Sequence, residues 1–200
     1  MSSPASTPLA SGLDVRFPVV LRRPRRFRVD RAETWPRVEG RLEFHEGELR
    51  YMPPCADEQG QVVFSLVTVL GPWVRKHREF IGGTNEQGML LDGSVRAADG
   101  AVWRRDTLKG QVPGTFFRVP PVLAVEVAGQ DEEAEILREK ARWYLEHGVT
   151  VVWLLFPGAR SVEVLTVNEH LVLPQSKSVP SHPALPGLAP RVRDFFAQLG

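Results

Sequence analysis

Two apolar segments that flank one long helical segment constrain the fold of this chain more than any other feature. The first is PVLAVEV at Pro121–Val127 and the second is VTVVWLLF at Val149–Phe156. Both have the continuous apolar character of strands that are buried on both faces. The segment 131–147 between them is the clearest helix in the sequence, with Asp131 as a candidate N-cap and Gly148 as a stop. This helix has the length of a crossover connection, which predicts that the two strands lie side by side in one sheet with a right-handed connection.

The remaining segments complete an α/β pattern. A β-hairpin is predicted around Glu46-Gly47, because apolar and polar residues alternate on both sides of this turn. Apolar residues at helical spacing predict a helix over 57–77, which Gly71-Pro72 should end or kink. Further strands are expected at 86–93, 99–105, 161–167 and 170–174, with a short amphipathic helix at 190–200. We therefore expect a mixed β-sheet flanked by helices, with an N-terminal β-hairpin.

A flexible arm followed by one domain is the organisation that length and composition predict. Residues 1–28 are rich in Ser, Pro and Arg and form the expected arm, which leaves residues 29–200 as a single domain. The stretch LRRPRRFR at Leu21–Arg28 holds five arginines. Two interpretations remain open for these arginines: a solvated arm and a contact for phosphate groups. Pro24 and the lack of an apolar period favour the first slightly.

The composition argues against several classes of protein. Hydrophobic residues make up 42% and charged residues 24%, and a net charge of +1 does not fit a polycation built for nucleic acid. The single cysteine, Cys55, allows no disulfide within the chain, and the scattered histidines predict no structural zinc site. No signal peptide is evident, and no apolar run approaches the ~20 residues of a membrane span. We therefore expect a cytoplasmic protein with no membrane partner.

Glu126 is an acid within an apolar strand, and it needs a partner. Burying an ionised carboxylate alone costs several kcal/mol, so a cation, a hydrogen-bond donor or a metal should lie beside it. Lys140 falls within the apolar stripe of the following helix and has the converse need for an anion. Pairing Lys140 with the Glu126 site satisfies both residues. The alternative is a lysine at the edge of the packed face, with its stem over Trp143.

Two further acids are weak candidates when each is taken alone. Asp99 stands before Gly100 at the head of a short strand, where an aspartate is more often a turn residue than a ligand. Glu48 follows the predicted hairpin turn, where an exposed acid without a function is the ordinary expectation.

Five sequence blocks nevertheless form a pattern together. They are EGELRYMPP, VRAADGAVW, VLAVEVAG, EKARWYLEHGVTVVWLL and LPGLAPRVRDFF, and they occur in this order between Val38 and Leu199. In their order and spacing the chain resembles the Uma-type restriction endonuclease family, a branch of the PD-(D/E)XK nuclease superfamily. The resemblance implies a restriction-endonuclease-like core, in which a mixed sheet is flanked by helices.

The resemblance also implies a role for each candidate residue. Asp99 corresponds to the acid of the PD block and Glu126 to the acid of the ExK block, and both would bind Mg²⁺ or Mn²⁺. The lysine of ExK would fall at Ala128, so Lys140 on the following helix resembles its replacement. Glu48 resembles an additional catalytic acid supplied by the opening segment.

Hydrolysis of DNA phosphodiester bonds is the reaction that this resemblance implies. The chain departs from the family pattern at Ala98, where a proline is usual, and at Gly60, near the usual place of a histidine. A catalytically weak or inactive protein that binds nucleic acid or a protein partner is therefore the alternative. We also expect a homodimer, because two sites related by a two-fold axis can cut both strands of a duplex. Three tryptophans, Trp73, Trp103 and Trp143, exceed what one small core obviously needs and support this expectation.

Overall fold

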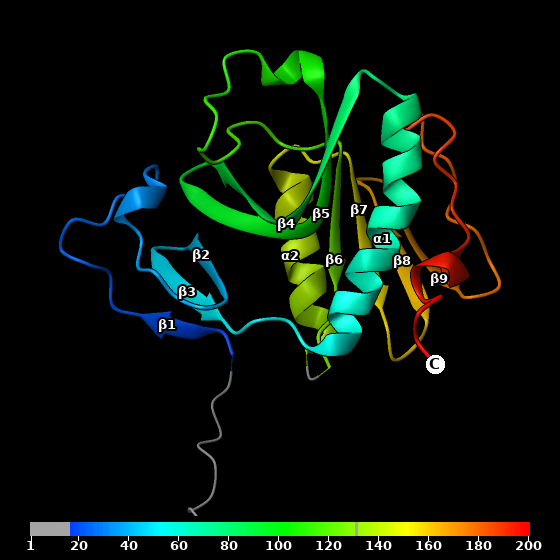
Figure 1. Ribbon diagram of the computed structural model, residues 1–200, viewed down its shortest axis with the longest axis horizontal. Helices are drawn as coiled ribbons and strands as arrows, with labels where there is room; N and C mark the ends of the chain where they lie inside the picture. The colour runs from blue at the N-terminus through cyan, green and yellow to red at the C-terminus, as the bar shows by residue number, and fades with distance from the viewer. Residues whose placement is uncertain (1–16, 131) are drawn as a thin grey trace, which may run out of the picture.

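The computed structural model, which describes residues 17–130 and 132–200, contains a nine-stranded mixed sheet with helices on both faces (Figure 1). The strands are β1 (Val19–Leu21), β2 (Arg41–His45), β3 (Glu48–Met52), β4 (Phe80–Leu91), β5 (Ser94–Arg104), β6 (Leu123–Val127), β7 (Val151–Phe156), β8 (Ser161–Leu165) and β9 (His170–Pro174). Their order is β1-β3-β2-β5-β6-β7-β8-β9, and β4 pairs with the other side of β5. The expected mixed sheet with flanking helices is thus present.

In the described part of the chain, three α-helices and two short 3₁₀ turns accompany the sheet. They are α1 (Asp57–Lys76), α2 (Ala134–Glu146) and α3 (Val192–Phe195), with η1 (Ala32–Thr34) and η2 (Arg105–Leu108). None of the described helices combines the length and the apolar character that a membrane crossing requires.

Alternation along the central strands sends side chains to two separate cores. Val125 of β6 and Trp153 of β7 belong to the core that includes Leu66 of α1. Ala124 of β6 belongs to the second core, which includes Leu137 of α2. The helices α1 and α2 therefore cover opposite faces of the sheet (Figure 1).

The strand–helix–strand prediction is confirmed. The strands β6 and β7 are parallel neighbours, paired from Leu123↔Val151 to Val127↔Leu155, and α2 lies between them in the chain. The helix begins at Ala134 after Glu133 as N-cap, later than expected. The candidate cap Asp131 lies outside the described residues.

Gly71-Pro72 does not end α1, contrary to expectation, because the helix continues through Pro72 to Lys76. Proline removes one hydrogen bond from a helix. Leu70 and Trp73 on either side of it are buried in the core, and the Trp73 indole N–H donates to the Pro186 carbonyl at 2.9 Å. Tertiary packing of this last turn outweighs the lost bond.

Two strands are longer than the sequence predicts. Segments expected as short strands belong to a hairpin of 12 and 11 residues, β4 and β5, which turns at Asp92-Gly93. Both turn residues have positive φ, 44° and 74°, as tight hairpins require. The C-terminal helix α3 is shorter than expected, at 4 residues.

The N-terminal hairpin forms as predicted, with its turn at Glu46-Gly47 between β2 and β3. The part of the expected arm that the structure describes, residues 17–28, is attached to this hairpin, because β1 pairs with β3 from Val19↔Tyr51 to Leu21↔Leu49. The sheet therefore extends beyond the domain boundary expected at residue 29. Residues 1–16 lie outside the described part of the chain.

Candidate functional site

The candidate site lies at a fork in the sheet. On the side of β5 that faces away from β4, β2 pairs at Val95 and β6 pairs from Gly100 to Val102, so the described ladder is interrupted between these points. In this gap, side chains form hydrogen bonds with backbone groups of β5. The Ala97 N–H donates to Glu43 Oε1 at 3.1 Å, and the Ala97 carbonyl accepts from Lys140 Nζ at 2.9 Å. Because buried backbone groups need partners, the fork itself requires polar side chains.

Asp99 and Glu126 face each other across this fork. Continuing the register from Gly100↔Val125 places Asp99 opposite Glu126. Opposite residues of antiparallel strands have side chains on the same face of the sheet. Asp99 Oδ2 accepts the Val127 N–H at 2.7 Å, and Glu126 Oε1 accepts a hydrogen bond from the Tyr144 hydroxyl at 2.7 Å. Both carboxylates are buried, on the face of the sheet that α2 covers.

Lys140 reaches the two buried glutamates from the middle of α2. Its ammonium lies 2.9 Å from Glu126 Oε1, 2.9 Å from Glu43 Oε1 and 2.9 Å from the Ala97 carbonyl. The contact with the Ala97 carbonyl is a hydrogen bond and the other two are ion pairs, so the buried ammonium has compensating partners. Lys140 is only 6% exposed, so the alternative of a lysine at the edge of the packed face is excluded. The pairing with Glu126 that the sequence predicts is confirmed.

Glu43 of β2 completes the cluster, although it is not among the acids predicted from the sequence. Its carboxylate lies 2.9 Å from Lys140 Nζ, 3.3 Å from Arg96 Nε and 3.9 Å from Arg41 Nε. Arg41 also lies 3.5 Å from Asp99 Oδ1. Strand alternation shows that Arg41 and Glu43 share one face of β2, with apolar residues on the other, but it does not show that the charged face is buried. We call Arg41, Glu43, Arg96, Asp99, Glu126 and Lys140 the charged cluster.

The cluster shifts the pKa values of its acids in opposite directions. Burial would raise the pKa of Glu43, but the positive charges of Lys140, Arg41 and Arg96 outweigh burial and lower it to about 2. For Glu126, burial is the largest cause and raises the pKa, with Lys140 opposing it and Asp99 adding to it. Burial therefore contributes more to the raised pKa of Glu126 than repulsion by Asp99 does. Burial, followed by the charge of Glu126, raises the pKa of Tyr144.

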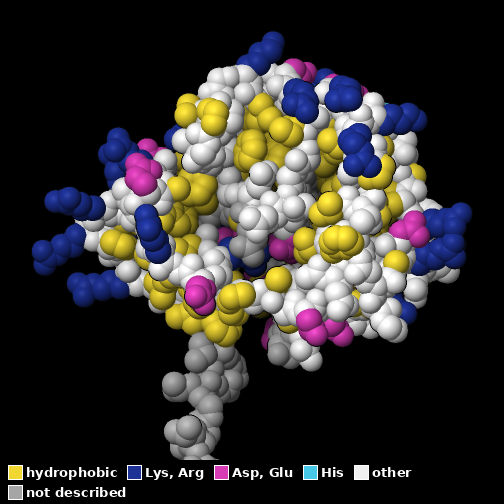
Figure 2. All heavy atoms as spheres, viewed as in Figure 1, with side chains coloured by type: hydrophobic (Ala, Val, Ile, Leu, Met, Phe, Trp, Pro, Cys, Tyr) yellow, Lys and Arg dark blue, Asp and Glu magenta, His cyan; other side chains and the backbone are white. Residues whose placement is uncertain are grey.

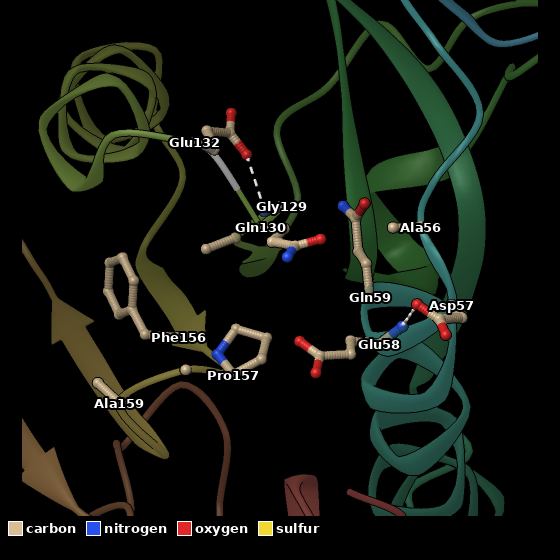
Figure 3. Close-up of a pocket in the computed structure, with 12 residues that line it drawn as sticks. Ala56, Asp57, Glu58, Gln59, Gly129, Gln130, Glu132, Phe156, Pro157 and Ala159 are labelled. Carbon is tan, nitrogen blue, oxygen red and sulfur yellow. Dashed lines mark hydrogen bonds between the residues drawn. The ribbon is translucent and has the colours of Figure 1, made fainter.

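A pocket of about 230 Å³ opens where β6 and β7 end and α1 begins (Figure 3). The Gln59 amide on the α1 side donates to the Val127 carbonyl at 2.9 Å. Glu132 lies on the opposite side, where its carboxylate accepts the Gly129 N–H at 3.2 Å (Figure 3). Burial raises the pKa of Glu132. The wall of the pocket includes Ala128, two residues beyond Glu126, so the pocket borders the charged cluster.

Comparison with known proteins supports the resemblance. Residues 29–194 match the Uma2 family, described as "Putative restriction endonuclease". The chain belongs to the Uma2 family. A crystal structure described as "a putative nuclease belonging to DUF820 from Anabaena variabilis ATCC 29413" matches with a TM-score of 0.72 and 20% identity. The match covers 82% of this chain and 93% of the other, and it shows that the two folds are alike. No curated protein matches the chain.

The structure brings together three of the four residues that the sequence analysis selected in this Uma2 chain. Asp99, Glu126 and Lys140 converge, whereas Glu48 does not join them. Glu48 is the strand partner of His45 beside the hairpin turn. Its side chain is 45% exposed, and its Oε2 lies 3.0 Å from Nη2 of Arg50. The acid that the opening segment contributes to the cluster is Glu43. Glu43 lies on β2 and Glu48 on β3, the two strands of the same hairpin. The sequence block alone does not show which of these strands faces the cluster.

The donor set of the cluster fits a hard divalent cation such as Mg²⁺ or Mn²⁺. Mg²⁺ is usually held by one or two carboxylates together with water and substrate phosphates. Both donors that bind the Glu126 carboxylate reach Oε1, and within the described residues none reaches Oε2. The described chain contains no group of three or more His, Cys, Asp or Glu side chains that could hold a metal ion. An ion held by Asp99 and Glu126 would therefore need oxygens of water or substrate as its other ligands.

Proposed function

We propose that this chain is a metal-dependent endonuclease that hydrolyses DNA phosphodiester bonds. The observation that carries the proposal is the convergence of Asp99, Glu126 and Lys140 from two strands and a helix at one fork of the sheet. The hydrogen bond from the Val127 N–H gives Asp99 a structural role, but no backbone group of the described residues bonds the Glu126 carboxylate, so backbone pairing does not explain this second acid. Membership of the Uma2 family and the core expected for PD-(D/E)XK nucleases support the same function.

The residues of the cluster have separable roles in this proposal. Asp99 and Glu126 would hold Mg²⁺ or Mn²⁺, which would supply polarisation of a phosphoryl oxygen and of the attacking water. Lys140 positions the Glu126 carboxylate and offsets negative charge that develops on the phosphate. Glu43 in turn positions Lys140, and the Tyr144 hydroxyl fixes the orientation of the Glu126 carboxylate.

A second candidate function is a nuclease-fold protein that binds nucleic acid or a partner without cleaving. The observation that favours it is charge balance, since the three acids of the charged cluster face three bases. This set is neutral without an added ion. The two candidates differ in one respect that can be measured, which is cleavage that depends on a divalent cation.

Cleavage of supercoiled plasmid DNA tests the proposal. The wild-type chain should nick or linearise the plasmid with Mg²⁺ or Mn²⁺ and not with a chelator. Glu126→Gln should abolish cleavage and Mg²⁺ binding measured by calorimetry while the circular dichroism spectrum is retained. Glu48→Gln is the matched control, because it makes the same chemical change at an exposed acid outside the cluster.

The outcomes separate the two candidates. Cation-dependent cleavage that Glu126→Gln removes and Glu48→Gln preserves supports the endonuclease. The wild-type chain could instead bind DNA but neither bind Mg²⁺ or Mn²⁺ nor cleave in their presence. That result would contradict the endonuclease proposal and support the non-catalytic protein.

A further inference from the structure

The arginine-rich segment is part of the ordered structure over residues 22–28, which we call the arginine loop. All five of its arginines are exposed. They are Arg22, Arg23, Arg25, Arg26 and Arg28. Lysine and arginine side chains project from the edge of the molecule over β1 and the segment that follows it (Figures 1 and 2). The loop is thus a strongly basic surface on a chain whose net charge is only +1.

The arginine loop is fixed by packing on both sides. The strand β1 directly before it pairs with β3. Within the loop, the Phe27 N–H donates to the Pro24 carbonyl at 3.0 Å. The Phe27 ring lies 5.4 Å from the ring of Trp35 and 5.3 Å from that of Phe44, measured between centroids. A basic segment held in one conformation loses less entropy on binding a partner than a free arm would lose.

The positive charge of the loop is almost uncompensated within the described structure. Arg28 pairs with Asp30 at 3.3 Å. In the described part of the chain, no ion pair within 4.0 Å involves Arg22, Arg25 or Arg26. Arg23 lies with its guanidinium 6.0 Å from the centre of the Phe44 ring. Neighbouring like charges repel each other, so a polyanion that binds here relieves this repulsion.

A second pocket lies between the segment that follows the loop and the charged cluster. This pocket has a volume of about 210 Å³ and is lined by Ala32 and Trp35 of the segment after the loop. It is also lined by Arg41 and Ala97, which take part in the contacts of the fork. Charged side chains are visible in a hollow in the middle of the face in Figure 2. The pocket therefore reaches from the segment that follows the loop to Arg41 and Ala97 at the fork.

We propose that the arginine loop binds the sugar–phosphate backbone of duplex DNA next to the candidate site. This inference rests on the proposed function for the choice of DNA as the polyanion. The loop carries arginine and no lysine, and the planar guanidinium matches the geometry of phosphate with two parallel hydrogen bonds. Contacts to phosphate position a protein on DNA without reading its sequence. The loop therefore supplies affinity and register, and it does not supply target choice.

The salt dependence of binding tests this surface. Each arginine that neutralises a phosphate of B-DNA adds about 0.9 to the slope of log K against log salt concentration. The variant Arg22→Gln/Arg25→Gln/Arg26→Gln should therefore lower the slope by about 2 to 3 and weaken binding at least about tenfold at low salt. The three side chains are exposed, so the thermal unfolding midpoint should not change. Fluorescence anisotropy with a labelled DNA duplex, in Ca²⁺ in place of Mg²⁺, measures both quantities.

A charge-matched control uses basic residues at the other end of the sheet. Lys177, Arg191 and Arg193 are exposed and lie in the chain after β9. Their triple change to Gln removes the same formal charge and should leave the slope within about 1 of the wild-type value. Equal effects of the two triple variants would show that only the total charge matters, and they would overturn the proposal.

The measurement also distinguishes other polyanions and the proposed function. Tighter binding of an RNA duplex, or equal competition by polyglutamate, would overturn the assignment to DNA. Cleavage assays with the same proteins test the enzyme separately. If the chain shows the slope change but no nuclease activity, the arginine loop binds DNA as proposed and the endonuclease proposal is wrong. If the chain cleaves DNA but its DNA binding does not depend on the loop arginines, the endonuclease proposal stands and the proposal for the loop is wrong.

Discussion

Glu43 and Glu126 share one lysine, yet their environments give them different tasks. Three cations surround Glu43 and keep its carboxyl ionised, with its pKa lowered to about 2. Glu126 has Lys140 as its main cation and remains dominated by burial, which raises its pKa. Glu43 is therefore suited to hold Lys140 in place, whereas Glu126 gains most from an additional cation beside it.

Glu43→Gln tests the structural half of this division. A carboxyl whose pKa is lowered in the folded state stabilises the protein above its unfolded value of 4.5, and this contribution is lost as the pH falls toward about 2. The shift corresponds to a stability on the order of 3 kcal/mol at neutral pH. We expect the variant to lose roughly this amount at pH ~7, with a smaller difference from wild type at lower pH. Urea unfolding across this pH range measures it, and Glu46→Gln at the exposed hairpin turn is the control. A difference that stays constant with pH would contradict the assignment.

Lys140→Gln tests the coupling to metal binding. Lys140 is the main positive charge that lowers the pKa of Glu126, so its removal should raise this pKa further. Protons compete with metal for a carboxylate, so Mg²⁺ binding of the variant should need a higher pH than in wild type. At alkaline pH, binding should return while cleavage remains slow. Calorimetric titrations at several pH values measure this. Arg142→Gln, an exposed change on the same helix, should leave the profile unshifted.

Sequence reasoning at the residue scale identified part of the cluster for a physical reason. A buried acid in an apolar strand and a lysine in an apolar helical stripe both need compensation, and each is visible without a structure. Glu43 and Arg41 were missed because their burial depends on the pairing of β2 with β5 at Phe44↔Val95. No local pattern specifies that distant pairing.

The fork depends on close packing between β5 and α1 at the element scale. Gly100 follows Asp99, and a Cβ added there would lie 2.7 Å from Leu66 Cδ2 of α1. The absence of a side chain at Gly100 allows the helix to approach the strand that carries Asp99. A Cβ added at Gly60 in the first turns of α1 would have Cys55 Sγ as its nearest contact, at 3.9 Å.

Two Gly→Ala substitutions should therefore have opposite effects on stability. Gly100→Ala should destabilise by about 1–3 kcal/mol, because a packed core must move to accept the methyl group. Gly60→Ala should stabilise by about 0.5–1 kcal/mol, because alanine favours the helix and meets no obstacle. Chemical unfolding of both variants measures the difference. A stabilising Gly100→Ala would show that the approach of α1 to β5 is less tight than described.

Element lengths were harder to predict than element types. The hairpin β4–β5 was read as two short strands, since the glycines and polar residues of 82–88 hide its continuity. Its length comes from pairing along the whole of both strands, with an irregularity between Thr84 and Gln87. The helix α1 continues through Pro72 because Trp73 is anchored in the core. In both cases tertiary contacts decide where an element ends.

The fold of the whole molecule was predictable where its connections are local. The unit β6–α2–β7 and the hairpin β2–β3 were both recognisable from continuous segments. The attachment of β1 to β3 and the side-by-side placement of β2 and β6 along β5 involve segments far apart in the chain. These non-local pairings create the fork, and the fork determines which acids meet.

A homodimer remains a prediction for the whole molecule, with a changed basis. Trp73, Trp103 and Trp143 are 8%, 0% and 7% exposed, so they belong to the core of this chain and provide no interface. The remaining reason is chemical: one candidate site per chain acts on one strand, and two sites related by a two-fold axis can cut a duplex in one binding event. Light scattering should then give twice the chain mass of 22.4 kDa at concentrations where the plasmid is linearised directly. A monomer at all concentrations, with nicked circles accumulating before linear product, would show instead that single chains cut the strands one after the other.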